Sequence, residues 1–60
     1  MRIPRVGELW KDKDRHLLIK RLRMNDPVYS DWIYYYIVDW DLESDTSLSS
    51  FLRYSNHVSG

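Results

Sequence analysis

The sequence predicts a small all-β fold: a meander of four to five antiparallel strands that closes into a barrel, with one short helical turn near the C-terminus. Stretches rich in β-branched and aromatic residues alternate with polar turns, which is typical of such folds. Sixty residues are enough for one domain, 1–60. The chain has no cysteine, so its three Trp, five Tyr and one Phe have to stabilise the core in place of disulfides or a zinc–thiolate site.

The first half of the chain predicts two strands. Residues 7–10 begin with a glycine, which is typical of a short strand entered through a bulge or a close backbone approach. Residues 11–15 are all charged and predict an exposed turn. Residues 16–24 are rich in Leu and Ile and predict the second strand, which ends before Pro27 because proline fixes φ and restricts the residue before it.

The strongest strand signal covers residues 32–42. Eight of these eleven residues are aromatic or β-branched. Eleven residues at about 3.3 Å each would extend for about 36 Å, which is too long for a flat strand in so small a domain. We therefore expect this strand to bend sharply or to break, and residues 43–47 to turn away from it.

A helical turn is expected after this strand. Leu48, Phe51 and Leu52 have the spacing i, i+3 and i+4, so one α or 3₁₀ turn would direct all three into the core. The residues that could cap this turn are Asp45, Thr46 and Ser47. The short segment Asn56–Ser59 could add a last edge strand.

Two motifs resemble those of small SH3-like barrel proteins, which are common in bacterial and phage genomes. Residues 6–10 (VGELW) are similar to the Gly-x-x-Trp opening of these proteins. Residues 47–52 (SLSSFL) are similar to the helical turn before their last strand, where a Phe fills the barrel. The resemblance implies an SH3-like barrel and a generic adaptor or nucleic-acid role, and it assigns no functional residue.

The net charge is zero, but the two halves of the chain have opposite charge. Residues 1–23 hold eight basic and three acidic side chains, a net +5, and residues 24–60 hold one basic and six acidic side chains, a net −5. The basic residues that could contact phosphate are Lys11, Lys13, Arg15, Lys20, Arg21 and Arg23. Phosphate-binding domains usually have a pI above about 9. The pI here is near 6.7, which favours charge pairing within the fold or across a homo-oligomer contact.

Alternation along residues 32–42 sends neighbouring side chains to opposite faces of a sheet. The odd positions Ile33, Tyr35 and Ile37 fit a core, so the even positions would present aromatic side chains on the surface, as protein interfaces do. Alternatively, the loop 25–31 or the helical turn covers the even positions as a second small core. The expected contact residues are Trp32, Tyr34, Tyr36 and Trp40, with Lys20 and Arg21 at the margin.

The remaining polar motifs could form a cation site or a catalytic site. The alternating acids Asp39, Asp41, Glu43 and Asp45 could converge on a divalent cation, but the glycine and glutamate that an EF-hand loop requires are serines here. We interpret this stretch as a solvated turn. His16 and His57 accompany neither a nucleophile elbow nor a phosphate-binding glycine loop. We expect no catalytic site, no metal and no cofactor.

The sequence therefore predicts a non-enzymatic protein-interaction module, such as a phage or mobile-element protein that binds and modulates or inhibits a host protein. Its partner would be another protein or a second copy of the chain. A nucleic-acid-binding accessory protein is the alternative. The N-terminus lacks a signal-peptide pattern, and no segment reaches the roughly 18 apolar residues of a membrane span. We expect a cytoplasmic protein with no membrane partner.

Overall fold

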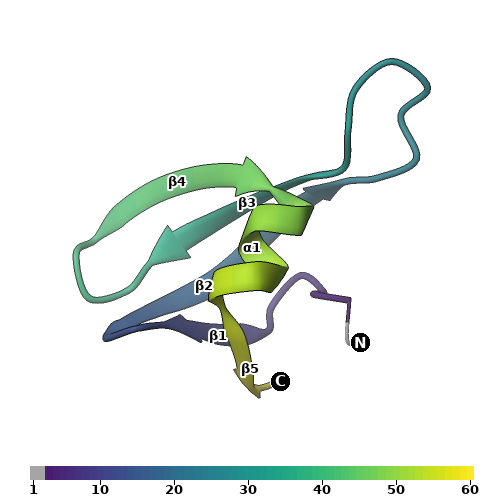
Figure 1. The fold of residues 1–60 in the computed structure, drawn as a ribbon. Helices are drawn as coiled ribbons and strands as arrows, with labels where there is room; N and C mark the ends of the chain where they lie inside the picture. Colours follow the sequence, from purple (N-terminus) through teal and green to yellow (C-terminus); the bar gives the residue numbers. More distant parts are fainter. Residues whose placement is uncertain (1–2) are drawn as a thin grey trace.

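A computed structural model describes residues 3–60 as one antiparallel sheet of five strands with one short helix (Figure 1). The elements in chain order are β1 (Leu9–Asp12), β2 (Arg15–Arg23), β3 (Trp32–Ile37), β4 (Leu42–Ser47), α1 (Leu48–Tyr54) and β5 (Asn56–Ser59). Their order across the sheet is β4-β3-β2-β1-β5, and every neighbouring pair is antiparallel. The predicted antiparallel β fold with a helix near the C-terminus is confirmed, and a fifth strand forms.

The first hairpin begins later and turns more tightly than the sequence predicts. β1 starts at Leu9, and Gly7 before it has a φ of 91° and donates its N–H to the carbonyl of Ile19 at 2.9 Å. Asp12 pairs with Arg15, so the charged segment contributes to both strands and only two residues form the turn. Lys13 in this turn has a φ of 57°, in the left-handed region that tight hairpin turns use.

The predicted strand 32–42 is two strands. β3 ends at Ile37, the chain reverses, and β4 begins at Leu42. The prediction of a break is confirmed, but the prediction that residues 43–47 turn away from the sheet is wrong, because they form β4 and pair with β3 along its whole length. β4 has a polar sequence, which is tolerated because β4 is an edge strand and exposes most of its side chains to solvent.

Helix α1 covers one face of the sheet and completes the core. Ser47 is its N-cap, and the Ser47 Oγ accepts a hydrogen bond from the Ser50 N–H at 3.3 Å. Phe51 is buried with its ring centroid 5.2 Å from that of Trp10 and 5.6 Å from that of Tyr35. Leu48 is also buried, and Leu52 is partly buried against the core. The predicted role of the helical turn is confirmed.

The sheet stays open between its two edges. Within residues 3–60, no hydrogen-bonded ladder joins β4 to β5. Helix α1 connects these two edge strands and packs against β3 and β4 (Figure 1). The predicted closure into a barrel is therefore not made by strand pairing, and one open edge remains on each side of the sheet.

Candidate functional site

The two faces of β3 differ in burial. Ile33, Tyr35 and Ile37 are exposed by 0%, 8% and 2%, and they form the core face together with residues of β1, β2 and α1. The outer face is the opposite side of the sheet, where Trp32, Tyr34 and Tyr36 are half-buried. The odd positions of β3 are thus the core, as the alternation predicts.

The helix does not cover the outer face within residues 3–60. Helix α1 is the one element that packs across the sheet, and its Phe51 lies in the core. It therefore does not form a second small core over the even positions. The loop 25–31 approaches one end of this face, where Arg23 lies between the rings of Tyr29 and Trp32.

The register of the sheet arranges the outer face in three rows, because residues paired directly across strands share a face. Tyr34 lies between Arg21 of β2 and Asp45 of β4. Tyr36 lies between Leu18 and Glu43. The aromatic row of β3 (Trp32, Tyr34 and Tyr36) is thus flanked by a basic row on β2 (Lys20 and Arg21) and an acidic row on β4 (Glu43 and Asp45).

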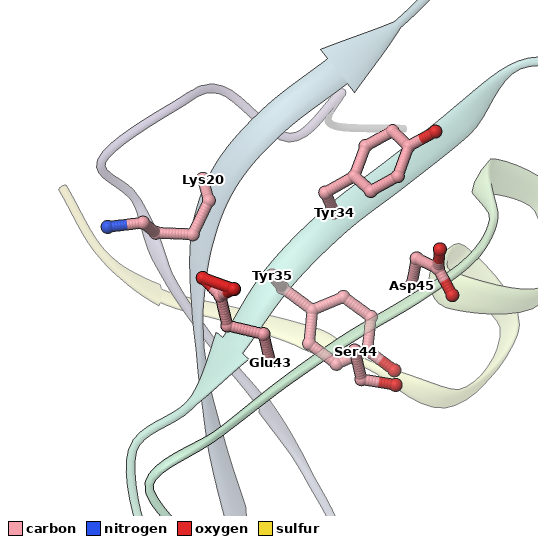
Figure 2. A pocket seen from close by; sticks show the side chains of 6 residues that line it. All are labelled: Lys20, Tyr34, Tyr35, Glu43, Ser44 and Asp45. Carbon is pink, nitrogen blue, oxygen red and sulfur yellow. The ribbon is translucent and has the colours of Figure 1, made fainter.

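A bulge in β2 produces the basic row. Ile19 pairs with Tyr35 and Arg21 pairs with Tyr34, so Lys20 is an extra residue with no partner in the β2–β3 register. Lys20 lines an open hollow together with Tyr34, Tyr35, Glu43, Ser44 and Asp45 (Figure 2). The bulge therefore places two successive basic residues beside the same tyrosine.

Arginine side chains rest on the aromatic row. The Cζ atom of Arg21 lies 4.9 Å from the ring centroid of Tyr34. Arg23 lies between Trp32 and Tyr29, at 5.7 Å and 5.2 Å from their ring centroids, and its Nη2 donates to the Ser30 carbonyl at 3.0 Å. Arg23 therefore contacts the β2–β3 loop, whereas Lys20 and Arg21 are exposed to solvent.

An acidic residue binds Tyr36, the last residue of the aromatic row along β3. The phenol of Tyr36 donates a hydrogen bond to the carboxylate of Asp41, which lies in the turn after β3. This hydrogen bond, desolvation and the carboxylate charge together raise the pKa of Tyr36 above its usual value. The hydrogen bond links the outer end of the Tyr36 ring to the turn after β3.

Trp40 is separated from the other predicted contact residues. It lies in the turn between β3 and β4, is 59% exposed, and has the Arg15 Cζ atom 5.3 Å from its ring centroid. Arg15 is two residues before Leu17 on β2, and strand alternation places both on the core side. The structure brings Trp32, Tyr34 and Tyr36 together on one strand face and places Trp40 outside that row.

The six basic residues of the alternative nucleic-acid site are divided between two regions. Lys20, Arg21 and Arg23 lie along the C-terminal half of β2. Lys11 and Lys13 belong to the β1–β2 hairpin, where Arg15 forms an ion pair with Asp12. The strand register therefore gives two separate basic clusters.

The two histidines lie beside different carboxylates. The backbone N–H and the ring Nδ1 of His16 both contact the Asp39 carboxylate, and the backbone hydrogen bond is the main cause of a lowered pKa of Asp39. The Nε2 of His57 lies 3.8 Å from Oε2 of Glu8. Among residues 3–60, no group of three His, Cys, Asp or Glu side chains is arranged to hold a metal ion.

Glu8 is a buried acid that the sequence analysis does not single out. It is 4% exposed, and its Oε1 accepts hydrogen bonds from the Arg5 N–H at 2.9 Å and from the Trp10 Nε1–H at 3.1 Å. Glu8 lies just before β1 and two residues before Trp10, a spacing that puts both side chains on the same side of an extended chain. The carboxylate satisfies donors at the core and has a structural role.

The loop between β2 and β3 carries further exposed apolar residues. Val28 and Tyr29 are 77% and 63% exposed, on a loop that extends beyond the sheet (Figure 1). The Asp26 carboxylate accepts the N–H groups of both residues, at 2.8 Å and 2.9 Å, and these hydrogen bonds lower the pKa of Asp26. The loop tip is thus shaped locally by one aspartate.

Known proteins give no further guide to this site. The chain matches no family model, no curated protein and no solved structure. No helix within residues 3–60 is long and apolar enough to cross a membrane. The outer face combines a basic, an aromatic and an acidic row on three neighbouring strands.

Proposed function

We propose that this protein is a non-enzymatic protein-interaction module that binds its partner through the outer face. Trp32, Tyr34 and Tyr36 would be the anchors, with Lys20 and Arg21 at the margin. The observation that carries the proposal is the aromatic row itself, which lies on the side of the sheet opposite the core, while the one described helix packs on the core side. Interface hot spots are enriched in Trp, Tyr and Arg, and this face combines all three.

The topology supports an SH3-like version of this proposal. Four strands follow one another as a meander, and a helical turn precedes the fifth strand, which returns to pair with β1. This is the arrangement that the resemblance of residues 6–10 and 47–52 implies. The same proposal places the module in the cytoplasm, where proteins without disulfides are common.

Protein is favoured over nucleic acid because of the acidic row. Lys20, Arg21 and Tyr34 could together contact a phosphate and a base. However, Asp45 is directly across from Tyr34 on the same face, so a phosphate backbone crossing the aromatic row would meet a carboxylate. A protein surface can offer both signs of charge, which suits a face that carries both.

A pull-down from host extract, with and without nuclease, tests the proposal. The double variant Tyr34→Ser, Tyr36→Ser should keep its circular dichroism spectrum and lose the partner. The matched control is Tyr54→Ser, because Tyr54 is 60% exposed on α1 and does not belong to the outer face. Retention of the partner by the folded double variant would contradict the proposal, and loss of the partner on nuclease treatment would favour the nucleic-acid alternative.

A further inference from the structure

We propose that the outer face binds a second copy of this chain, related by a two-fold axis that runs parallel to β3. This inference rests on the proposed function, because it takes the outer face as the interface and names its occupant. The argument depends on the order of the three rows: basic on β2, aromatic on β3 and acidic on β4.

The charges of the two outer rows are free to meet charges on another molecule. Lys20, Arg21, Glu43 and Asp45 are all exposed. None of these four side chains forms an ion pair with any residue from 3 to 60. Rows of opposite sign thus lie on the two sides of β3 without neutralising each other inside the monomer.

Symmetry decides how two such faces can pack. Closed dimers are mostly two-fold symmetric, and each copy uses the same patch. When the axis runs along β3, the basic row of one copy lies over the acidic row of the other, and the two aromatic rows meet at the centre. When the axis runs across β3, basic lies over basic and acidic over acidic. Charge complementarity therefore selects the axis parallel to β3.

The register of the sheet makes this pairing specific. Arg21, Tyr34 and Asp45 lie at one level across the sheet. Rotation about an axis along β3 preserves that level, so Arg21 of one copy meets Asp45 of the second copy while the two Tyr34 rings approach each other. The arrangement has aromatic anchors at its centre and charged residues at its rim, as strong interfaces do.

The size and charge of the chain are compatible with such a dimer. A standard interface buries about 800 Å² per partner. The described chain exposes 4309 Å², so one face of the sheet would have to supply roughly a fifth of its surface. The formal net charge is zero, so two copies have no long-range repulsion to overcome.

Charge reversal with rescue tests the inference on the full chain. Sedimentation velocity over a range of concentrations should show a dimer for the wild type. The variants Lys20→Glu, Arg21→Glu and Glu43→Lys, Asp45→Lys should each weaken the dimer by about thirtyfold or more, as loss of an interface hot spot does. An equimolar mixture of the two variants should restore the dimer, because both contacts are then between opposite charges.

A control variant separates position from total charge. Lys13→Glu, Arg53→Glu changes the net charge by the same amount as Lys20→Glu, Arg21→Glu, but its residues lie in the β1–β2 turn and on α1. It should dimerise like the wild type. Circular dichroism on every variant checks that the sheet is retained.

The outcomes distinguish the two proposals. A wild type that stays monomeric at all concentrations overturns the inference, while loss of a host partner in Tyr34→Ser, Tyr36→Ser would still uphold the proposed function. A wild-type dimer that neither the charge reversals nor the tyrosine variant weakens overturns the inference, because the contact then lies elsewhere. A dimer that is lost in both reversed variants and regained in their mixture supports the inference. If the axis ran across β3, rows of like charge would face each other in the wild type, so the wild-type dimer itself would not be stable.

Discussion

The two faces of β3 place the same kinds of side chain in different environments. On the core face, Tyr35 is buried and packs on Phe51. On the outer face, Tyr34 and Tyr36 are its immediate neighbours in sequence, yet they are half-buried and are held by a guanidinium group and a carboxylate. The difference shows that an aromatic side chain is buried in the core or left half-exposed according to what packs against it.

The largest expected effect is on the core face. Phe51→Ala removes the ring that packs on Trp10 and Tyr35 and should lower the free energy of unfolding by about 3–5 kcal/mol. Since 60 residues correspond to roughly 3–9 kcal/mol of total stability, this change would remove about a third or more of it. Urea titration followed by circular dichroism measures the effect. Tyr54→Ala on the same helix is the control, with an expected change within about 0.5 kcal/mol, and coincident curves for Phe51→Ala and wild type would contradict the described core.

A comparison of two acids extends the contrast beyond aromatic residues. Glu8→Ala leaves the Trp10 indole N–H and the Arg5 N–H without their acceptor in a buried site, and should cost about 1–3 kcal/mol. Glu43→Ala on the outer face should change stability by less than about 0.5 kcal/mol. Thermal melts of both variants measure the difference. Equal melting temperatures would mean that the Glu8 hydrogen bonds contribute little.

A smaller effect is expected where Arg21 lies over Tyr34. The cation–π contact at 4.9 Å should contribute about 0.5–1 kcal/mol at this exposed position. A double-mutant cycle with Arg21→Ala and Tyr34→Leu isolates that coupling from the separate effects of each change. Coupling indistinguishable from zero would show that the outer face is not ordered by this contact and that its rows are only loosely positioned.

The smallest effect concerns acid sensitivity at the turn that separates the two strands. The pKa of Asp39 is lowered in the folded state, mainly by the His16 backbone N–H. As the pH falls, the unfolded state binds the proton first, near 3.8, so the contribution of Asp39 is present above that pH and is lost as the pH falls through the folded pKa. Melting temperatures of wild type and Asp39→Asn between about pH 6 and pH 2 should converge toward the acid end. A constant difference over that range would contradict the assignment.

Local sequence patterns were sufficient to predict which side chains lie on each face of β3 and of α1. Alternation along residues 32–37 separates Ile33, Tyr35 and Ile37 from Trp32, Tyr34 and Tyr36 because successive side chains on any strand point to opposite sides. The spacing of Leu48 and Phe51 likewise places both on one side of a helix without reference to the remainder of the chain. These features depend on residues within one turn or one pleat of each other, so the sequence by itself determines them.

The tertiary structure decided where strands end and which rows meet. The turn after β3 places Trp40 outside the predicted aromatic stripe, and in this turn the Asp39 carboxylate accepts the N–H of His16, 23 residues away. The bulge that sets Lys20 beside Tyr34 exists only through the register between β2 and β3. The acidic row joins the outer face because β4 pairs with β3, although its sequence has little strand propensity. Register and edge pairing depend on hydrogen bonds between segments far apart in the chain. A pattern of neighbouring residues does not show which distant segments will pair, or in which register.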